Sequence, residues 1–341
     1  MKIIVDAMGG DLAPLAPVKG ALMAHEKYGA DIILAGRTEE ILRALQQCGC
    51  KDLPDGVEIV NAEEVVEICD DPATAFKRKK DSSLTVGLTM LRDGRADGFV
   101  CAGSTGALLA GATLVVKRIR GLRRAALAPV IPTAKGRAVL IDCGANAECT
   151  VEYLLQFAYL GSYYAQKVLG VAAPRVALLN IGAEESKGDE LRREAYQKLK
   201  EAGAAGYLNF TGNIEAKEAM LGECDVIVAD GYSGNIMLKS IEGTGKLLSI
   251  KLKEMLMHST GTKLAALLLR SRLGDFKKML DANEVGGTAL LGISKPVIKA
   301  HGSASELGFC NAVRQAMEVA KSGIIGDIEQ NIDRMRLGRD A

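Results

Sequence analysis

Short runs of apolar, largely β-branched residues alternate with segments of helical periodicity along most of this chain. The predicted strands are Ile3–Val5, Asp31–Ala35, Val57–Val60, Gly98–Cys101, Ala138–Asp142, Arg175–Leu179, Asp225–Ala229 and Val297–Ala300. The predicted helices are Pro17–Tyr28, Glu39–Gln47, Ser83–Asp93, Thr105–Lys117, Tyr153–Leu169, Asp189–Glu201 and Ser303–Lys321. Continuously apolar strands separated by helices are typical of a parallel sheet covered on both faces. The pattern therefore predicts an α/β fold.

Length and charge narrow the class of protein further. The 341 residues are 48% hydrophobic, which is enough to bury a large core in one large domain or about two smaller ones. The 43 Lys and Arg residues almost balance 42 Asp and Glu, so overall charge favours no nucleic-acid partner. The N-terminus lacks a signal-peptide pattern and no apolar run reaches the roughly 20 residues of a membrane span, so we expect a cytoplasmic protein. The polar stretch 327–341 is predicted to be a loosely packed tail.

Cysteine and histidine usage gives little support for a metal site. The chain has eight cysteines but only three histidines, and it contains no C-x-x-C pair. Zinc sites usually need such clustered ligands, so we interpret the cysteines as small buried thiols. No metal and no cofactor is predicted.

The segment 244–281 interrupts the alternation of strands and helices. Leucines and methionines recur there at helical spacing, which predicts a helical hairpin projecting from the α/β body. Eight Lys and Arg residues against three Asp and Glu give the segment a local net charge of +5. Core helices, a dimer interface and a membrane-surface element are competing interpretations. We favour Thr244–Leu256 at a subunit interface and Leu264–Leu280 at the membrane, because basic amphipathic helices attract anionic lipids.

Six strand ends run into turns rich in glycine and small polar residues. Ligands of open α/β sheets bind beyond the carboxyl ends of the strands, and glycine lets backbone N–H groups approach an anion. Any one of these turns could serve only as a helix cap, but six together predict a phosphate-binding site. The predicted phosphate- or substrate-binding residues are Asp6, Gly9, Gly10, Gly103, Ser104, Thr105, Gly106, Asn146, Asn180, Gly182, Glu184, Gly188, Asp230, Gly234, Lys239, Lys299, Gly302 and Ser303.

A few side chains within these turns could act on a substrate directly. Lys187 and His301 are the preferred cations because each lies in a glycine-containing turn between a strand and a helix. Asn235, like Asn146 and Asn180, could donate hydrogen bonds to an oxyanion without adding charge. We predict catalytic roles for Lys187, Asn235 and His301. The competing interpretations are solvated lysines, a capping histidine and asparagines that only shape turns.

Standard fingerprints of three enzyme classes are missing from these turns. Gly103 and Gly106 do not form G-x-G-x-x-G, and Gly243-Thr-Gly245-Lys246 lacks the spacing of a P-loop. Gly231-Tyr-Ser-Gly234 is one residue short of a G-x-S-x-G nucleophile elbow. These differences argue against a dinucleotide oxidoreductase, a nucleoside triphosphatase and an α/β-hydrolase.

The turn sequences resemble those of one family, the bacterial phosphate acyltransferases. The similar strings occur in the same order, from the first strand to the final helix. The similar strings are Val5-Asp-Ala-Met-Gly-Gly-Asp11, Cys101-Ala-Gly-Ser-Thr-Gly-Ala107, Asp142-Cys-Gly-Ala-Asn146, Leu179-Asn-Ile-Gly-Ala-Glu-Glu-Ser-Lys-Gly188, Asp230-Gly-Tyr-Ser-Gly-Asn-Ile-Met-Leu-Lys239, Glu242-Gly243 and Ile298-Lys-Ala-His-Gly-Ser303. The chain departs from the usual family residues at Ser104, Cys143 and Ala304, where Asn, Val and Ser are common.

The resemblance implies a fold, a reaction and partners. The implied fold is a single two-lobed domain over residues 1–341, a three-layer α/β/α sandwich of the isocitrate/isopropylmalate dehydrogenase-like type that is related to phosphotransacetylases. The implied reaction transfers a long-chain fatty acyl group from acyl carrier protein to inorganic phosphate, giving acyl-phosphate for phospholipid synthesis. The enzyme would be a homodimer that binds the membrane surface peripherally and passes its product to a membrane glycerol-3-phosphate acyltransferase.

Phosphate is itself the nucleophile in such a reaction, so no Ser–His–Asp or Cys–His unit is required. Two alternatives stay open at this point. A phosphotransacetylase would use a CoA thioester in the same class of reaction. A non-catalytic adaptor for a membrane or a carrier protein would use the enzyme fold without turnover.

Overall fold

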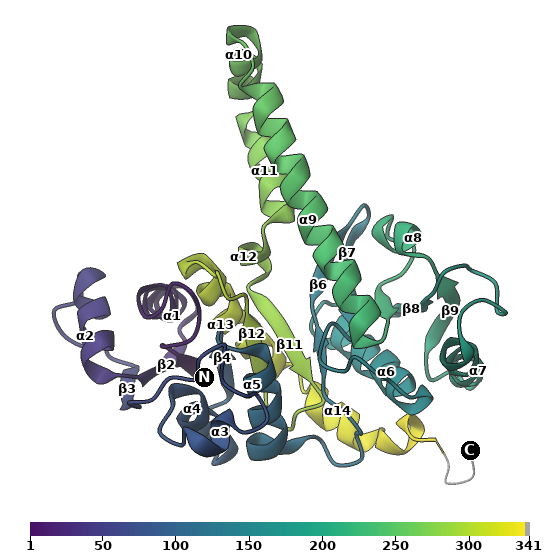
Figure 1. Cartoon of the computed structure of the whole chain (residues 1–341), viewed down its shortest axis with the longest axis horizontal. Coiled ribbons are helices and arrows are strands. Elements are labelled where there is room, and N and C mark those ends of the chain that lie inside the picture. Colours follow the sequence, from purple (N-terminus) through teal and green to yellow (C-terminus); the bar gives the residue numbers. More distant parts are fainter. Residues whose placement is uncertain (338–341) are drawn as a thin grey trace.

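The computed structural model describes residues 1–337 and contains two β-sheets with helices on both faces (Figure 1). The strands are β1 (Lys2–Asp6), β2 (Asp31–Gly36), β3 (Val57–Asn61), β4 (Gly98–Cys101), β5 (Ala126–Ala128), β6 (Val130–Thr133), β7 (Gly136–Ile141), β8 (Arg175–Leu179), β9 (Asn209–Ile214), β10 (Val226–Val228), β11 (Gly287–Leu291) and β12 (Val297–Ala300). The helices are α1 (Leu15–Tyr28), α2 (Thr38–Gln47), α3 (Ala75–Arg78), α4 (Ser83–Arg92), α5 (Thr105–Gly111), η1 (Ala112–Lys117), α6 (Val151–Lys167), α7 (Glu190–Ala204), α8 (Ala216–Met220), α9 (Gly231–Leu256), α10 (Thr260–Leu268), α11 (Arg270–Leu280), α12 (Ala282–Val285), α13 (Glu306–Lys321), α14 (Ile324–Gln330) and η2 (Ile332–Met335).

Each sheet with its helices forms one lobe. The first lobe has seven strands in the order β3-β2-β1-β4-β12-β11-β5, and the second has five in the order β6-β7-β10-β8-β9. Most neighbours are parallel, but β11 is antiparallel to β12 and β5, and β6 is antiparallel to β7. The chain passes from β5 of the first sheet almost directly into β6 of the second, and it returns at β11. The lobes therefore meet where the chain crosses between them.

Alternating strand residues point into two different hydrophobic cores. In β1, Ile3 and Val5 pack into one core and Ile4 packs into the other. The strands of the second lobe alternate in the same way, so each core runs along one face of both sheets. This burial on both faces explains why the central strands are apolar throughout.

All eight predicted strands are present, with their ends shifted by at most two residues. Four strands were not predicted, namely β5, β6, β9 and β11. Strands β5, β6 and β9 are edge strands, where Pro132 and Gly212 are tolerated and apolar alternation is weak. The prediction of one parallel sheet is thus corrected to two sheets with antiparallel strands near their meeting edges.

The seven predicted helices are also present, with two corrections. The segment Thr105–Lys117 is α5 followed by the π-helical η1, and α13 begins at Glu306 rather than at Ser303. Ser305 caps α13 by accepting a hydrogen bond from the Gly308 N–H.

The prediction of a loose tail from residue 327 is wrong as far as residue 337. Helices α14 and η2 pack Ile328 and Met335 into the core there. The last four residues of that predicted tail lie outside the described residues.

Helices α9, α10 and α11 form a hairpin that projects from the two lobes (Figure 1). We call the part of this hairpin from Thr244 to Leu280 the arm. Helix α9 has 26 residues and is about 39 Å long at ~1.5 Å rise per residue. Its buried residues all lie in its first half, which packs on the second lobe, and its second half extends beyond that lobe. Neither α10 nor α11 contains a buried residue, so the interpretation as core helices is wrong.

Candidate functional site

A cleft of about 450 Å³ lies between the two lobes at the carboxyl ends of their strands. We call it the interlobe cleft. Six of the predicted site residues line it, and they come from both lobes: Thr105, Asn235, Lys239, Lys299, His301 and Gly302. The structure therefore brings together side chains that are separated by almost two hundred residues of sequence.

Three turns of the first lobe pack tightly beside this cleft. Gly10 has φ +105°, and a side chain there would lie 3.1 Å from the carbonyl oxygen of Gly302. The neighbouring Asp11 N–H donates to that carbonyl at 2.8 Å. A Cβ on Gly9 would lie 2.8 Å from the Gly103 nitrogen. These positions need glycine because three backbone segments converge there.

The buried side chain of Asp6 holds these turns in place through hydrogen bonds. Its carboxylate accepts hydrogen bonds from the Met8 N–H at 3.1 Å and from the Cys101 thiol at 3.1 Å. The side chain is buried, and burial raises the pKa of Asp6. Asp6 therefore positions the turns of the site and does not face the cleft.

Lys299 is the cation most firmly held in the cleft. Its Nζ donates to the carbonyl oxygens of Ala102 at 3.0 Å and Ala300 at 2.5 Å. Partial burial lowers the pKa of Lys299, because removing an ammonium from water disfavours its charged form. Lys239 lines the same cleft but forms an exposed ion pair with Glu242 at 2.8 Å.

His301 is held by Ser303 in one orientation. The backbone N–H of Ser303 donates to His301 Nδ1 at 3.2 Å, and the Ser303 hydroxyl lies 2.9 Å from the same atom. Because a backbone N–H can only donate, Nδ1 is the acceptor and the proton of the neutral ring is on Nε2. His301 therefore offers an N–H donor to the cleft. The turn containing it precedes α13, so the predicted anion site at a helix start is corrected to a turn.

The turn at Gly103–Gly106, predicted as an anion site at a helix start, also caps helix α5. Ser104 is the N-cap of α5, and its hydroxyl accepts from the Ala107 N–H at 3.4 Å. Thr105, the next residue, is exposed and lines the cleft.

On the second lobe, several predicted residues hold the start of α9. Asn146 donates its side-chain amide to Asp142 Oδ2 at 2.9 Å and to the Ala125 carbonyl at 2.8 Å. Asp230 caps α9 by accepting from the Ser233 N–H at 2.8 Å, and it forms an ion pair with Arg192. These contacts position Asn235, one turn further along α9.

Gly234 packs against this network at very close range. A Cβ at Gly234 would lie 2.0 Å from the Asp142 carbonyl oxygen. We expect Gly234→Ala to lower the free energy of unfolding by ~1–3 kcal/mol, measured by urea denaturation, because rigid backbone must move. The matched control is Gly243→Ala in the same helix, where no atom lies within 4 Å of the new Cβ. That variant should be neutral or slightly more stable, and equal effects in both variants would contradict the explanation by close packing.

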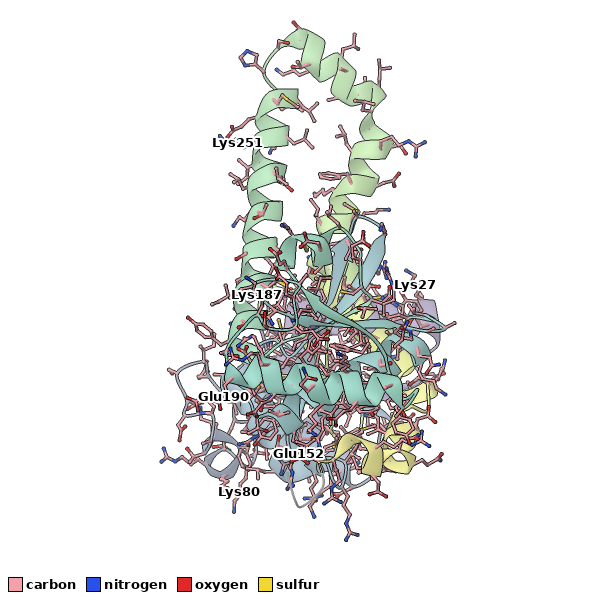
Figure 2. The ribbon with its side chains drawn as sticks, turned by 90° about the vertical axis from the view of Figure 1, so that its right-hand side faces the viewer. Lys27, Lys80, Glu152, Lys187, Glu190 and Lys251 are labelled. Atoms are coloured by element: carbon pink, nitrogen blue, oxygen red, sulfur yellow. The ribbon has the colours of Figure 1, made fainter. Side chains whose placement is uncertain are left out.

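The predicted turn at Asn180–Gly188 lies elsewhere on the second lobe. Asn180 donates to the Lys187 carbonyl at 3.1 Å, Asn213 donates to the Glu184 carbonyl at 2.8 Å, and Gly188 has φ +89°. Gly182 is buried against the side chains of Glu184 and Lys187. The turn follows β8, which is parallel to β10, so it neighbours the turn that starts α9. Lys187 is exposed on the body below the arm and does not line the interlobe cleft (Figure 2).

Sequence reasoning missed two contributors to the site. Arg192 on α7 pairs with Asp189 at the start of its own helix and also binds Asp230 and Ser233 at the start of α9, and no local motif signals these contacts between two helices. The residues at the base of the arm, including Ile241 and Leu280, line the cleft, although their sequence indicates only helix. Residues 1–337 hold no group of three or more His, Cys, Asp or Glu side chains arranged to bind a metal ion.

The described fold and sequence match known proteins over nearly the whole chain. The family model described as "Fatty acid synthesis protein" matches residues 1–326. The "Phosphate acyltransferase" of Alkaliphilus oremlandii is 46% identical over 336 residues, covering 98% of this chain and 98% of the relative. The protein of that name from Thermoanaerobacterium thermosaccharolyticum is 42% identical over 333 residues, covering 98% and 97%. A solved phosphotransacetylase from Streptococcus pyogenes aligns with a TM-score of 0.63 at 20% identity, covering 94% of each chain.

The paired sheets with a cleft between them define the class: a three-layer α/β/α sandwich with the phosphotransacetylase fold. At 20% identity the structural neighbour establishes only that fold. The relatives at 42% and 46% identity are more specific. The chain belongs to the phosphate acyltransferase family, as the turn sequences suggested, and it is an acyltransferase that transfers an acyl group to phosphate.

Proposed function

We propose that this enzyme transfers a long-chain fatty acyl group from acyl carrier protein to inorganic phosphate, reversibly forming acyl-phosphate for phospholipid synthesis. The observation that carries the proposal is the interlobe cleft, where Lys299, His301 and Asn235 converge from two lobes. A cation and N–H donors in a narrow cleft suit a phosphate dianion placed beside a thioester carbonyl.

The cleft residues are assigned to a direct displacement. A phosphate oxygen attacks the carbonyl carbon, the new C–O bond forms, the C–S bond breaks, and the carrier thiolate leaves. Charge develops on the carbonyl oxygen during attack, and the N–H donors of His301 and Asn235 stabilise it. Lys299 binds the phosphate in the cleft. Lys187, which lies outside the cleft in the adjoining turn, reaches the phosphate once both substrates are bound.

Turnover assays test the reaction and its donor together. The enzyme is mixed with palmitoyl-acyl carrier protein with and without phosphate, and released thiol and acyl-phosphate are measured. We expect thiol release that requires phosphate, with equimolar acyl-phosphate. Equal or faster use of palmitoyl-CoA would favour the phosphotransacetylase alternative. No phosphate-dependent release from either donor would favour the adaptor alternative.

His301 supplies a donor in this scheme rather than a base. We expect His301→Ala to lower kcat by roughly 10- to 150-fold, since losing a hydrogen bond to a charged group costs ~1.5–3 kcal/mol. His301→Gln should recover most of the rate because its amide keeps an N–H donor. Steady-state rates across pH check this: if His301→Gln is as slow as His301→Ala and the pH profile loses a limb, His301 is the base instead.

The arm is proposed to serve dimerisation and membrane binding. Its outer surface carries exposed apolar residues along all three helices, with Leu247 and Met255 on α9, Leu267 and Leu268 on α10, and Phe276 on α11. Lysines and arginines lie between them, so the arm is both apolar and basic. We assign Thr244–Leu256 to contacts with a second copy and Leu264–Leu280 to the lipid surface. No helix within residues 1–337 combines the length and the apolar character that crossing a bilayer requires.

Such an arrangement suits the product. Long-chain acyl-phosphate is amphipathic, so an enzyme bound at the membrane surface could deliver it directly to a membrane glycerol-3-phosphate acyltransferase. The proposed location is therefore cytoplasmic and peripheral to the membrane.

A further inference from the structure

A second pocket lies on the opposite side of the lower part of α9 from the interlobe cleft. We call it the arm groove. Its volume is about 920 Å³, near the upper end of the roughly 300–1,000 Å³ typical of ligand pockets. Its apolar side chains come from five parts of the chain and include Ile181, Met220, Ile236, Leu248 and Met279. Ile181 is 80% exposed and Leu248 is 52% exposed, so this apolar surface faces solvent. Clustered exposed apolar residues commonly mark a binding site.

The charged side chains in the arm groove are already neutralised. Its two charged lining residues are Arg192 and Lys217. Arg192 binds Asp189 and Asp230, and Lys217 binds Glu215 and Glu218. The remaining lining offers few groups to a polar ligand and much surface to an apolar one. The chemistry of the groove therefore favours a hydrocarbon.

The arm groove and the interlobe cleft meet at the base of the arm. Five residues line both pockets: Pro132, Ile241, Gly245, Met279 and Leu280. Gly245 lies where α9 passes the end of α11, and a Cβ there would have Leu280 Cδ2 as its nearest neighbour, at 3.9 Å. A methyl group would fit at this point, but a larger side chain would fill the space between the two helices.

We propose that the arm groove binds the hydrocarbon chain of the acyl donor, which passes beside Gly245 into the interlobe cleft. The carbonyl then lies near His301 and Lys299, with the chain on the apolar side of α9. The inference rests on the proposed function and adds the subsite that selects long chains. A second copy of this protein could cover the outer mouth of the groove. A subunit contact at that position would not explain why the arm groove joins the interlobe cleft.

Chain length gives the inference a measurable signature. Each buried methylene strengthens binding by about fourfold. A donor with a 16-carbon chain should therefore depend on the groove, whereas a four-carbon chain should end before it. Blocking the passage beside Gly245 should affect only the longer donor.

The test uses Gly245→Leu in the full-length protein, with palmitoyl and butyryl thioesters of acyl carrier protein as donors. We expect Gly245→Leu to lower kcat/KM for the palmitoyl donor at least about tenfold, the equivalent of losing roughly two buried methylenes, with the butyryl donor changed less than about twofold. Gly243→Leu is the matched control, since its Cβ has no atom within 4 Å. It should leave both donors unchanged. A second variant, Met220→Glu, places a charge in the groove away from the cleft and should show the same selectivity for the shorter donor.

Several results would overturn the assignment. One is an unchanged kcat/KM for the palmitoyl donor in both Gly245→Leu and Met220→Glu. Another is an equal loss of kcat/KM with the palmitoyl and butyryl donors, either alone or together with a change in oligomeric state measured by light scattering. The combined result would identify the groove as a contact between copies. Failure of the proposed function would look different, because the unsubstituted enzyme would then release no thiol from either donor in response to phosphate.

Discussion

Lys187→Ala is expected to lower the turnover of acyl-phosphate formation by roughly 30- to 1000-fold, because a charge-assisted contact made in the transition state is worth ~2–4 kcal/mol. Lys187 lies in the glycine-containing turn after β8, beside the turn that starts α9. The position suits a cation that reaches the transferred phosphate once both substrates are bound. The measurement is kcat and kcat/KM with varied phosphate.

The fold should survive this change, which makes the result interpretable. The Lys187 side chain is exposed, and within residues 1–337 it takes part in no ion pair. The hydrogen bond from Asn180 reaches the Lys187 backbone carbonyl, which the substitution keeps. Lys198→Ala on α7 is the matched control, a half-buried lysine of the same lobe whose ion-pair partner within residues 1–337 is Glu201. Activity of Lys187→Ala within threefold of the unsubstituted enzyme would remove Lys187 from the site.

Replacing Leu268 and Leu269 by glutamate should abolish binding to anionic vesicles while acyl transfer in solution survives. Leu268 is 82% exposed at the end of α10, the most distant part of the arm, so neither substitution disturbs a core (Figure 1). The double change removes apolar contacts with lipid and adds two negative charges that repel anionic head groups. Co-sedimentation with phosphatidylglycerol vesicles measures the loss.

The control for this experiment adds the same charge elsewhere. Leu42 and Leu53 are exposed leucines of the first lobe, 44% and 42% accessible, and far from the arm. The Leu42→Glu, Leu53→Glu variant should still sediment with the vesicles. If the arm variant also sediments, α10 is not the membrane contact, and a subunit interface becomes the better explanation of its leucines.

Local sequence was sufficient to predict each strand or turn whose structure is determined by its own residues. Apolar runs such as Ile3–Val5 form central strands, because a strand buried on both faces needs apolar residues at every position. The turns at Gly9–Gly10 and Gly103–Gly106 were recognisable from their glycine-rich composition. At Gly9 and Gly10 the physical reason is that neighbouring backbone lies too close for a side chain. The leucine spacing of 244–281 likewise predicted the hairpin, because helical periodicity is a local property.

Contacts between distant segments had to come from the tertiary structure. Lys299 and Asn235 meet in one cleft because β12 and α9 belong to different lobes that face each other, which no local pattern encodes. The roles of Asn146 and Asp230 as supports for α9 depend on partners such as Arg192, reached through the fold. Edge strands such as β6 owe their place to pairing with a neighbour, so their own residues are weak predictors. The sequence by itself thus determined the central strands, the main helices, the glycine-rich turns and the family, since these follow from residues close together along the chain. Only the tertiary structure decided which turns form one site, because that depends on how two lobes pack.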